Sequence, residues 1–147
     1  GDVYKRQILN SGFDFFLEHE DYFFSGGADV YEDLTKKQSI FEIGCSPGRF
    51  LSYFHYNGFD VNGIDYSTEG NNQLKNNFRT QGIKDYNVYE EDFLKFKTSK
   101  KYDIVMSFGF IEHFDNPDIV FQKHLDLLKK LNSNRNSLSS FSEIRFL

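Results

Sequence analysis

The fold is decided by one stretch of the sequence, residues 39–58, which reads SIFEIGCSPGRFLSYFHYNG. Its first six residues form a short apolar run of the kind that makes a buried strand. A turn of small residues follows, and apolar residues then recur at helical spacing until Gly58. Glycine commonly ends a helix because it adopts the left-handed backbone conformation without a steric penalty. The stretch therefore predicts a strand over 39–44, a turn, and a helix over 49–57.

The same unit recurs along the chain. DVNGID at 60–65 predicts a second strand, and residues 68–81 predict a polar helix with Ser67 as its N-cap and Gly82 as its terminator. NVY at 87–89 and YDIVMSF at 102–108 predict a third and a fourth strand. Strands separated by helices of this length need crossover connections, which place them parallel in one sheet. We therefore expect a doubly wound α/β fold with a mostly parallel, Rossmann-like sheet.

A last helix is predicted to begin at Pro117, because proline is favoured in the first turn of a helix. Its apolar residues are expected to share one face, which should pack against the sheet. They are Val120, Phe121, Leu125 and Leu128.

The two ends of the chain differ in composition from the middle. Residues 1–7 resemble an adaptor-derived, non-native leader and are set aside. Residues 8–38 are expected to be an N-terminal helical segment, with a helix over 13–24. Residues 132–147 are rich in Ser and Asn and lack a run of branched apolar residues, so we expect coil or a frame-shifted tail. The α/β core then covers residues 39–131.

Charge and cysteine content argue against several function classes. The chain has 17 basic and 22 acidic residues, a net charge of −5, whereas binding to nucleic acid needs clustered Lys and Arg. Cys45 is the single cysteine, so neither an internal disulfide nor a cysteine-rich zinc site is available. No apolar run reaches the roughly 18 residues that span a bilayer, and no export signal is recognised. We expect a cytoplasmic protein without a metal, a nucleic-acid partner or a membrane partner.

The turn after the first strand is the first candidate site, because ligands of doubly wound sheets bind beyond the carboxyl ends of the strands. The helix start there presents N–H groups that favour an anionic group. A dinucleotide fingerprint would have glycine at 44, 46 and 49, and only Gly44 matches, which weakens a nicotinamide reading. A phosphate-binding P-loop would continue with Lys and then Ser or Thr, but Arg49 and Phe50 follow Gly48, which excludes it.

Four motifs in order resemble those of class I S-adenosylmethionine-dependent methyltransferases of the small-molecule type. The turn carries Glu42, Gly44, Ser46 and Gly48, which resembles the first motif, E/D-x-G-x-G-x-G, with its middle glycine replaced. GIDYS at 63–67, EDF at 91–93 and YDIV at 102–105 resemble the segments at the second, third and fourth strands. The resemblance covers roughly residues 39–130, and the order and spacing make the combination more specific than any one motif.

The resemblance implies S-adenosyl-L-methionine as the cofactor, with its methionine part along the turn. Glu42 would face the ammonium of the cofactor. Backbone N–H groups of Gly44, Ser46 and Gly48 would receive its carboxylate, and Cys45 lies among these expected contacts.

Further contacts are implied at the ends of the other strands. Asp65, about 20 residues after Gly44, would hold the ribose hydroxyls, a feature that nicotinamide enzymes share. Tyr66 would pack against the adenine, although it could equally be a core aromatic. Asp92 would accept from the adenine amine, its alternative being a loop cap.

The remaining expected residues lie at the third and fourth strands. Phe93 would contribute an apolar contact to the adenine, with a core aromatic as the alternative, and Ser107 would contact the cofactor from the end of the fourth strand. Glu112 and His113 follow that strand and are candidate catalytic residues. His113 could take a proton near neutral pH while Glu112 orients it; the alternative is a histidine that caps the loop.

The predicted function is methyl transfer from S-adenosyl-L-methionine to a small-molecule nucleophile, with an O, N or C acceptor left open. The chain resembles a truncated member that keeps most of the cofactor half, with the strands after the fourth missing. Two alternatives remain: a nicotinamide-dependent oxidoreductase, and a non-catalytic cofactor-binding remnant or interaction module.

Overall fold

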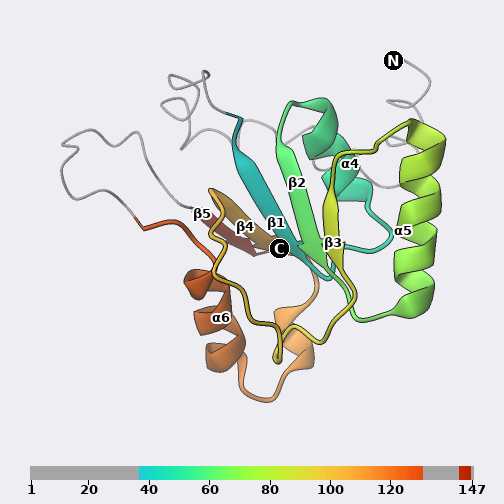
Figure 1. The fold of residues 1–147 in the computed structure, drawn as a ribbon. Helices are drawn as coiled ribbons and strands as arrows, with labels where there is room; N and C mark the ends of the chain where they lie inside the picture. Colours follow the sequence, from blue (N-terminus) through green and yellow to red (C-terminus); the bar gives the residue numbers. More distant parts are fainter. Residues whose placement is uncertain (1–36, 131–142, 147) are drawn as a thin grey trace, which may run out of the picture. The chain divides into compact units, whose positions relative to one another are not determined.

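The computed structural model describes residues 37–130 and 143–146 of the chain (Figure 1). The predicted leader, the helical segment with its helix over 13–24, and most of the tail lie outside the described residues.

The described residues form one sheet of five parallel strands in the order β3-β2-β1-β4-β5. This order reverses direction between β1 and β4, as in a Rossmann-like sheet. The predicted doubly wound, parallel α/β class is therefore confirmed. The strands are β1 Ser39–Ile43, β2 Asp60–Ile64, β3 Asn87–Tyr89, β4 Ile104–Ser107 and β5 Glu143–Phe146.

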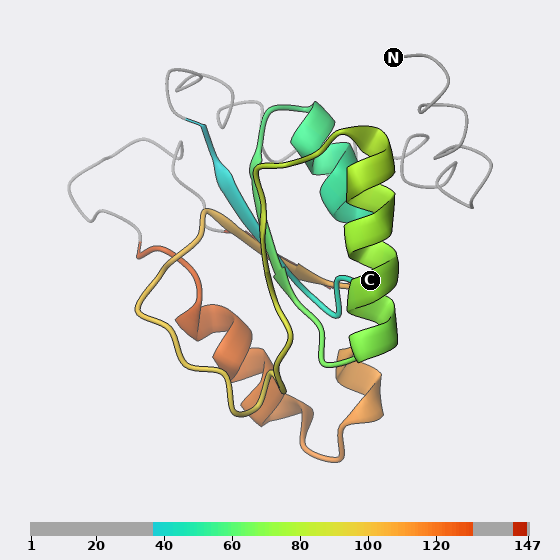
Figure 2. The same ribbon diagram turned by 45° about the vertical axis from the view of Figure 1, so that its right-hand side comes forward.

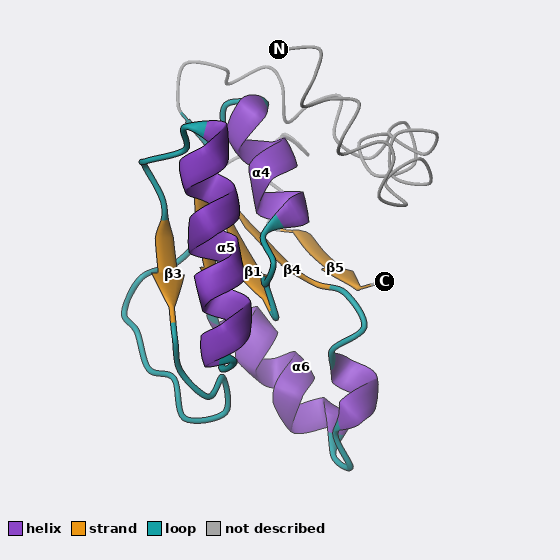
Figure 3. Ribbon diagram, turned by 90° about the vertical axis from the view of Figure 1, so that its right-hand side faces the viewer, coloured by secondary structure: helices purple, strands orange, loops and turns teal. Residues whose placement is uncertain are grey.

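Three helices and a short 3-10 turn connect the strands. They are α4 Arg49–Tyr56, α5 Thr68–Gln81, η3 Ile111–His113 and α6 Pro117–Asp126. Figure 2 shows α4 and α5 on one face of the sheet and α6 on the other. Figure 3 shows α5 running alongside α4. Within residues 37–130 and 143–146, no helix is long and apolar enough to cross a membrane.

The ends of α4 and α5 follow the predicted signals. The Ser67 hydroxyl accepts a hydrogen bond from the Gly70 N–H at 3.0 Å, which confirms Ser67 as the N-cap of α5. Gly82 ends α5 with φ 71°, and Gly58 follows α4 with φ 86°. Both values lie in the left-handed region, which glycine adopts without the Cβ clash of other residues.

The fourth strand begins at a polar anchor. The Asp103 carboxylate accepts from the Ser39 N–H at 2.7 Å and from the Lys129 ammonium at 2.9 Å. Burial alone would raise the pKa of Asp103, but these bonds lower it below the ordinary value. Asp103 therefore joins the start of β4 to the start of β1 and to the chain after α6, a structural role.

The predicted absence of strands after the fourth, and coil over 132–147, are wrong at residues 143–146. These residues form β5, which pairs with β4 from Ile104↔Glu143 to Ser107↔Phe146. The outer edge of β4 carries backbone N–H and C=O groups that need partners, and β5 supplies them. EIRF alternates charged and apolar residues, and this short period-2 pattern suffices for a strand without a run of branched residues.

The predicted apolar face of α6 is also wrong in part. Val120 is buried as expected, but Phe121 and Leu125 are 41% and 38% exposed. The residues that α6 buries against the sheet are Val120 and His124, and Leu127 directly after the helix continues that face. Their spacing of four and then three residues fits one helical stripe. A pattern of apolar residues alone does not identify this stripe, because His124 occupies one of its positions.

Candidate functional site

The candidate site lies where the strand order reverses, at the carboxyl ends of β1 and β4. The two strands are in register there, with Ile43 opposite Ser107 on one side and Ile64 on the other. The residues that follow these strands therefore emerge at one edge of the sheet, the usual ligand position in this architecture. They are the glycine turn 44–48, residues 65–67 and residues 107–113.

Two positions of the glycine turn, Gly44 and Gly48, have a backbone conformation and close neighbours that favour glycine. Gly44 has φ 73° and Gly48 has φ 91°. A Cβ at Gly48 would lie 2.7 Å from Cε1 of Phe78 and 2.9 Å from Cγ of Leu74, closer than real contacts allow. A Cβ at Gly44 would lie 3.2 Å from the Phe110 ring. The turn is therefore shaped by α5 on one side and by the segment after β4 on the other.

The N–H groups of the turn bond within the chain rather than pointing to open space. Gly44 N–H donates to the Ile64 carbonyl at 2.8 Å, and Gly48 N–H donates to the Cys45 carbonyl at 2.8 Å. Ser46 N–H donates to the Asp65 carboxylate at 3.0 Å. In the structure each of these three N–H groups therefore has a hydrogen-bond partner within the chain.

Asp65 is held firmly at the end of β2. Its carboxylate accepts from the N–H groups of Ser46 and Ser67, at 3.0 and 2.9 Å. The Asn71 amide donates to the Asp65 backbone carbonyl at 2.8 Å and fixes the turn from beneath. A carboxylate has about four acceptor positions, so two remain for a ligand. Half-burial of Asp65 leaves its carboxylate partly accessible.

Glu42 is a buried carboxyl with an unpartnered oxygen. Its side chain is 2% exposed, and Oε2 has no hydrogen-bond partner among the described residues. Burial and then the charge of Asp65 raise the pKa of Glu42 well above its ordinary value. A buried polar atom without a partner is costly, so this position is suited to a cationic or donating ligand group.

Two further groups in the turn are buried. Ser46 Oγ also has no partner among the described residues. The Cys45 thiol is 2% exposed, and burial, with smaller effects of Glu42 and Asp65, raises its pKa. Cys45 is therefore a neutral thiol that packs in the turn, while the backbone around it is what a ligand would contact.

The two aromatic residues predicted to contact the adenine, Tyr66 and Phe93, differ in exposure. Tyr66 is 79% exposed beyond β2, so it is no core residue and is accessible to a ligand. Phe93 is 5% exposed and packs against Phe110 and His124, so the core alternative describes it. Asp92 is exposed, and its Oδ1 accepts from the Leu94 N–H at 2.9 Å, as a loop cap does.

The residues after β4 divide into a buried and an exposed part. Ser107 is 2% exposed and lies 3.0 Å from His124 Nε2 through its Oγ. Glu112 and His113 are exposed on η3. The ring of Phe110 lies on the side of Gly44 where a Cβ would be, so this segment returns to the glycine turn.

Three residues that sequence reasoning did not single out make contacts near the site: Asn71, Phe110 and His124. Asn71 is 1% exposed and falls on the buried stripe of α5 with Leu74 and Phe78. A polar residue at an apolar spacing is the signal that could have identified Asn71, and the same signal applies to His124 on α6. No comparable signal marks Phe110, because a single phenylalanine does not stand out in a chain with 18 of them.

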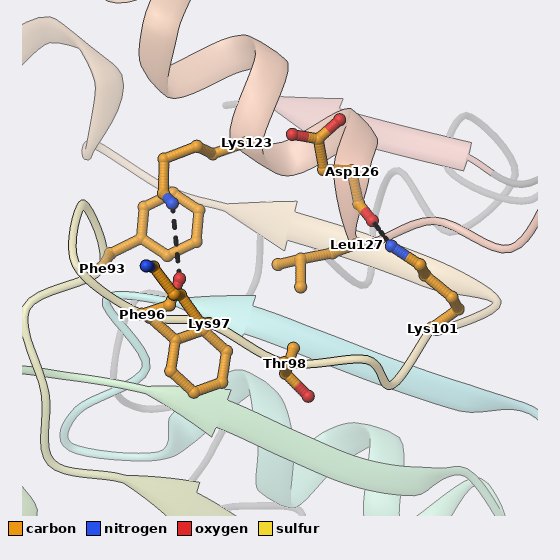
Figure 4. A pocket seen from close by; sticks show the side chains of 8 residues that line it. All are labelled: Phe93, Phe96, Lys97, Thr98, Lys101, Lys123, Asp126 and Leu127. Atoms are coloured by element: carbon orange, nitrogen blue, oxygen red, sulfur yellow. Dashed lines mark hydrogen bonds between the residues drawn. The ribbon is translucent and has the colours of Figure 1, made fainter.

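A pocket of about 200 Å³ lies apart from the glycine turn, against the end of α6 (Figure 4). Lys123 Nζ lies 5.6 Å over the Phe93 ring and donates to the Phe96 carbonyl at 3.4 Å, and Lys101 donates to the Asp126 carbonyl. These two ammonium groups are already partnered, and Phe93 alone among the predicted site residues lines the pocket, so we do not identify it with the candidate site. Its lining is Phe93, Phe96, Lys97, Thr98, Lys101, Lys123, Asp126 and Leu127.

No metal-binding cluster is found in the part of the chain that the structure describes, where three or more His, Cys, Asp or Glu side chains nowhere converge.

The chain matches a family model described as a methyltransferase domain over residues 16–132. It is 30% identical over 96 residues to a ubiquinone biosynthesis O-methyltransferase of Pelagibacter ubique, covering 65% of this chain and 39% of the relative. It is 26% identical over 88 residues to a probable (S)-tetrahydroprotoberberine N-methyltransferase 2 of Papaver bracteatum, covering 58% of this chain and 25% of the relative. The chain therefore spans well under half the length of these two relatives.

Among solved structures, the fold resembles a coclaurine N-methyltransferase bound to N-methylheliamine and S-adenosylhomocysteine. The TM-score is 0.58 at 18% identity, with 68% of this chain and 31% of that chain covered. At this identity the likeness shows the fold alone.

Proposed function

Because the chain belongs to the methyltransferase domain family, we propose that it binds S-adenosyl-L-methionine at the glycine turn and serves methyl transfer to a small-molecule nucleophile. The relatives described above are named as N- and O-methyltransferases, which supports the reaction class. The net charge of −5 favours a small acceptor over nucleic acid.

One observation carries the proposal: Glu42 is buried at the end of β1 with an unpartnered Oε2. The methionine part of the cofactor has an ammonium group, which would supply the missing donor and compensate the buried charge. The sulfonium is a second positive charge, and Asp65 lies close enough to Glu42 to raise its pKa. The residues present therefore fit a cationic ligand.

The other residues have separate roles in the proposed site. Asp65 offers its two remaining acceptor positions to the ribose hydroxyls. Tyr66, exposed beyond β2, packs against the adenine. Asp92 accepts from the adenine amine with the oxygen that does not cap its loop. Phe93 supports this wall from the core rather than by direct contact.

The turn contributes its shape. Gly44 and Gly48 lack side chains where Phe110 and α5 approach the backbone closely, and the buried Ser46 hydroxyl offers a further polar partner.

The methyl group needs little activation from the protein, because the sulfonium of the cofactor already makes it a good electrophile. The protein's contribution is to align the acceptor with the carbon–sulfur bond and to exclude water. His113, exposed on η3 beyond β4, takes the proton that an attacking hydroxyl or amine releases, and Glu112 orients it. Both residues are free to meet an acceptor that enters from this edge.

We further propose a cytoplasmic location. Cys45 is the single cysteine and is buried as a free thiol, which suits a reducing compartment.

Replacing Asp65 with asparagine tests the cofactor site. The Asp65→Asn variant loses a charged acceptor for the ribose hydroxyls, and we expect its affinity for S-adenosylhomocysteine to fall by roughly tenfold to a hundredfold, about 1.5–3 kcal/mol. Titration calorimetry of both proteins measures the change, and a thermal melt confirms that the variant is folded.

Asp85→Asn is the matched control, because Asp85 is an exposed aspartate whose ion pair with Lys37 lies at 3.5 Å on the surface. We expect its affinity to equal that of the wild type. An Asp65→Asn variant that is folded and binds as tightly as Asp85→Asn would remove Asp65 from the site.

A further inference from the structure

We infer that His124 is a positioning residue of the cofactor site, holding the end of β4 through a hydrogen bond with Ser107; this rests on the proposed function above. His124 is fully buried on α6, a helix to which no role in the site was assigned. Each of its two ring nitrogens lies within hydrogen-bond distance of a polar group. Nδ1 lies 2.7 Å from the Val120 carbonyl, and Nε2 lies 3.0 Å from Ser107 Oγ.

The partners fix the tautomer. A carbonyl oxygen can only accept, so Nδ1 carries the proton and donates it to Val120. Nε2 then carries a lone pair and accepts from the Ser107 hydroxyl. Burial lowers the pKa of His124, which keeps the ring neutral and this arrangement intact. The imidazole therefore directs the Ser107 hydroxyl toward α6.

Ser107 transmits this bond to the glycine turn. It is the last residue of β4 and pairs in register with Ile43, the residue immediately before Gly44. The segment that continues from Ser107 carries Phe110, whose ring would lie 3.2 Å from a Cβ placed on Gly44. A shift at Ser107 would therefore reach the turn by two routes, through Ile43 before it and through Phe110 beside it. The methionine part of the cofactor is proposed to lie in this turn.

His124 also supports the third strand's loop. Its ring meets the Phe93 ring edge to face, with centroids 5.3 Å apart at 77°. Phe93 directly follows Asp92, the proposed partner of the adenine amine. One buried side chain thus contacts the ends of two loops that carry proposed cofactor contacts.

The pair is no nucleophilic dyad. Ser107 and His124 are 2% and 0% exposed, so no substrate reaches the hydroxyl. Nδ1 is bonded to a backbone carbonyl and not to a carboxylate that could stabilise an imidazolium. An apolar residue would fill this stripe of α6 more simply, and the imidazole is tolerated because both nitrogens are bonded.

Two substitutions of His124 test its two hydrogen bonds one at a time. In His124→Gln the side-chain amide reaches the position of Nε2, where its oxygen can accept from Ser107. In His124→Asn the shorter amide reaches only the position of Nδ1, keeps the Val120 bond and leaves Ser107 without its acceptor. We expect His124→Gln to bind S-adenosylhomocysteine within about twofold of the wild type, and His124→Asn to bind about tenfold more weakly.

Thermal melts of both variants show how much each loses in stability, and Ser107→Ala completes a double-mutant cycle. If the bond transmits the effect, Ser107→Ala weakens affinity on its own and adds little in the His124→Asn background, because the interaction is already absent. If His124 acts only by packing, the loss of S-adenosylhomocysteine affinity in each variant should parallel its loss of melting temperature. The effects of Ser107→Ala and His124→Asn on affinity should then add in the double variant. That outcome would overturn the inference.

Nitrogen NMR of the wild-type ring tests the same point without a substitution that could unfold the chain. We expect a protonated Nδ1 and an unprotonated Nε2, with the Nε2 resonance shifting when S-adenosylhomocysteine saturates the protein. An Nε2 resonance that does not respond to bound ligand contradicts the positioning role and leaves the cofactor site standing. A folded wild type that binds no S-adenosylhomocysteine overturns the cofactor site and this inference together.

Discussion

Gly48→Ala is expected to destabilise the protein by about 2–5 kcal/mol, a large part of the stability of an ordinary domain. The backbone at Gly48 has φ 91°, where a residue with a side chain pays about 1–2 kcal/mol. The new Cβ would also lie 2.7 Å from Phe78 and 2.9 Å from Leu74, and such overpacking costs about 1–3 kcal/mol. Urea unfolding followed by circular dichroism measures the loss.

Gly58→Ala provides the matched control. Gly58 has a similar φ of 86°, but a Cβ there meets no atom within 4 Å. It should therefore show the backbone cost alone, about 1–2 kcal/mol. Equal losses in the two variants would contradict the close packing of α5 against the glycine turn.

Glu42→Gln is expected to move stability and cofactor affinity in opposite directions. In the free protein the substitution removes an ionisable carboxyl whose charged form burial disfavours, and we expect the variant to be more stable than the wild type at neutral pH. In the complex it removes the charge that faces the cofactor ammonium, and we expect at least tenfold weaker binding of S-adenosylhomocysteine, about 1.4 kcal/mol or more. Thermal melts and titration calorimetry give the two results.

The raised pKa of Glu42 also predicts how the stability of the folded protein changes with pH. The pKa of Glu42 is raised in the folded protein, so between the ordinary value and the folded value the folded state holds a proton that the unfolded state has lost. The free energy of unfolding of the wild type should therefore fall as pH rises through this window. Glu42→Gln should lack the part of this fall that comes from the ionisation of Glu42. Glu69→Gln, at an exposed carboxylate in the first turn of α5, is the control. A stability profile that is the same in wild type and Glu42→Gln would contradict a protonated, buried Glu42.

Local signals predicted most of the fold. Ser67 and Gly82 bound α5 because capping bonds and left-handed glycines act within a few residues of the chain. The short strands followed from apolar runs between turns, and their parallel order followed from the lengths of the helices between them.

The errors concern features that depend on distant contacts. β5 forms because the edge of β4 needs partners, and no property of the sequence at 143–146 alone specifies that pairing. His124 takes a buried position on α6 because Ser107 and the Val120 carbonyl satisfy its ring, which a hydropathy pattern cannot register.

The sequence predicted where the residues of the candidate site lie better than it predicted which contacts they make. Asp65 and Tyr66 lie beyond β2 where the motif places them, one half-buried and the other exposed. The bonds of the turn were not predictable, because whether Ser46 N–H meets a ligand or Asp65 depends on the three-dimensional path of two loops. The burial of Phe93 likewise depends on α6, which lies about 30 residues later in the chain.

The central claim is that this site accepts the methyltransferase cofactor and not a dinucleotide. Titration calorimetry of the folded chain with S-adenosylhomocysteine, and separately with NADH, tests it most directly. We predict saturable binding of one S-adenosylhomocysteine per chain and no binding of NADH. A cooperatively folded chain that binds NADH, or that binds neither molecule, would contradict the account.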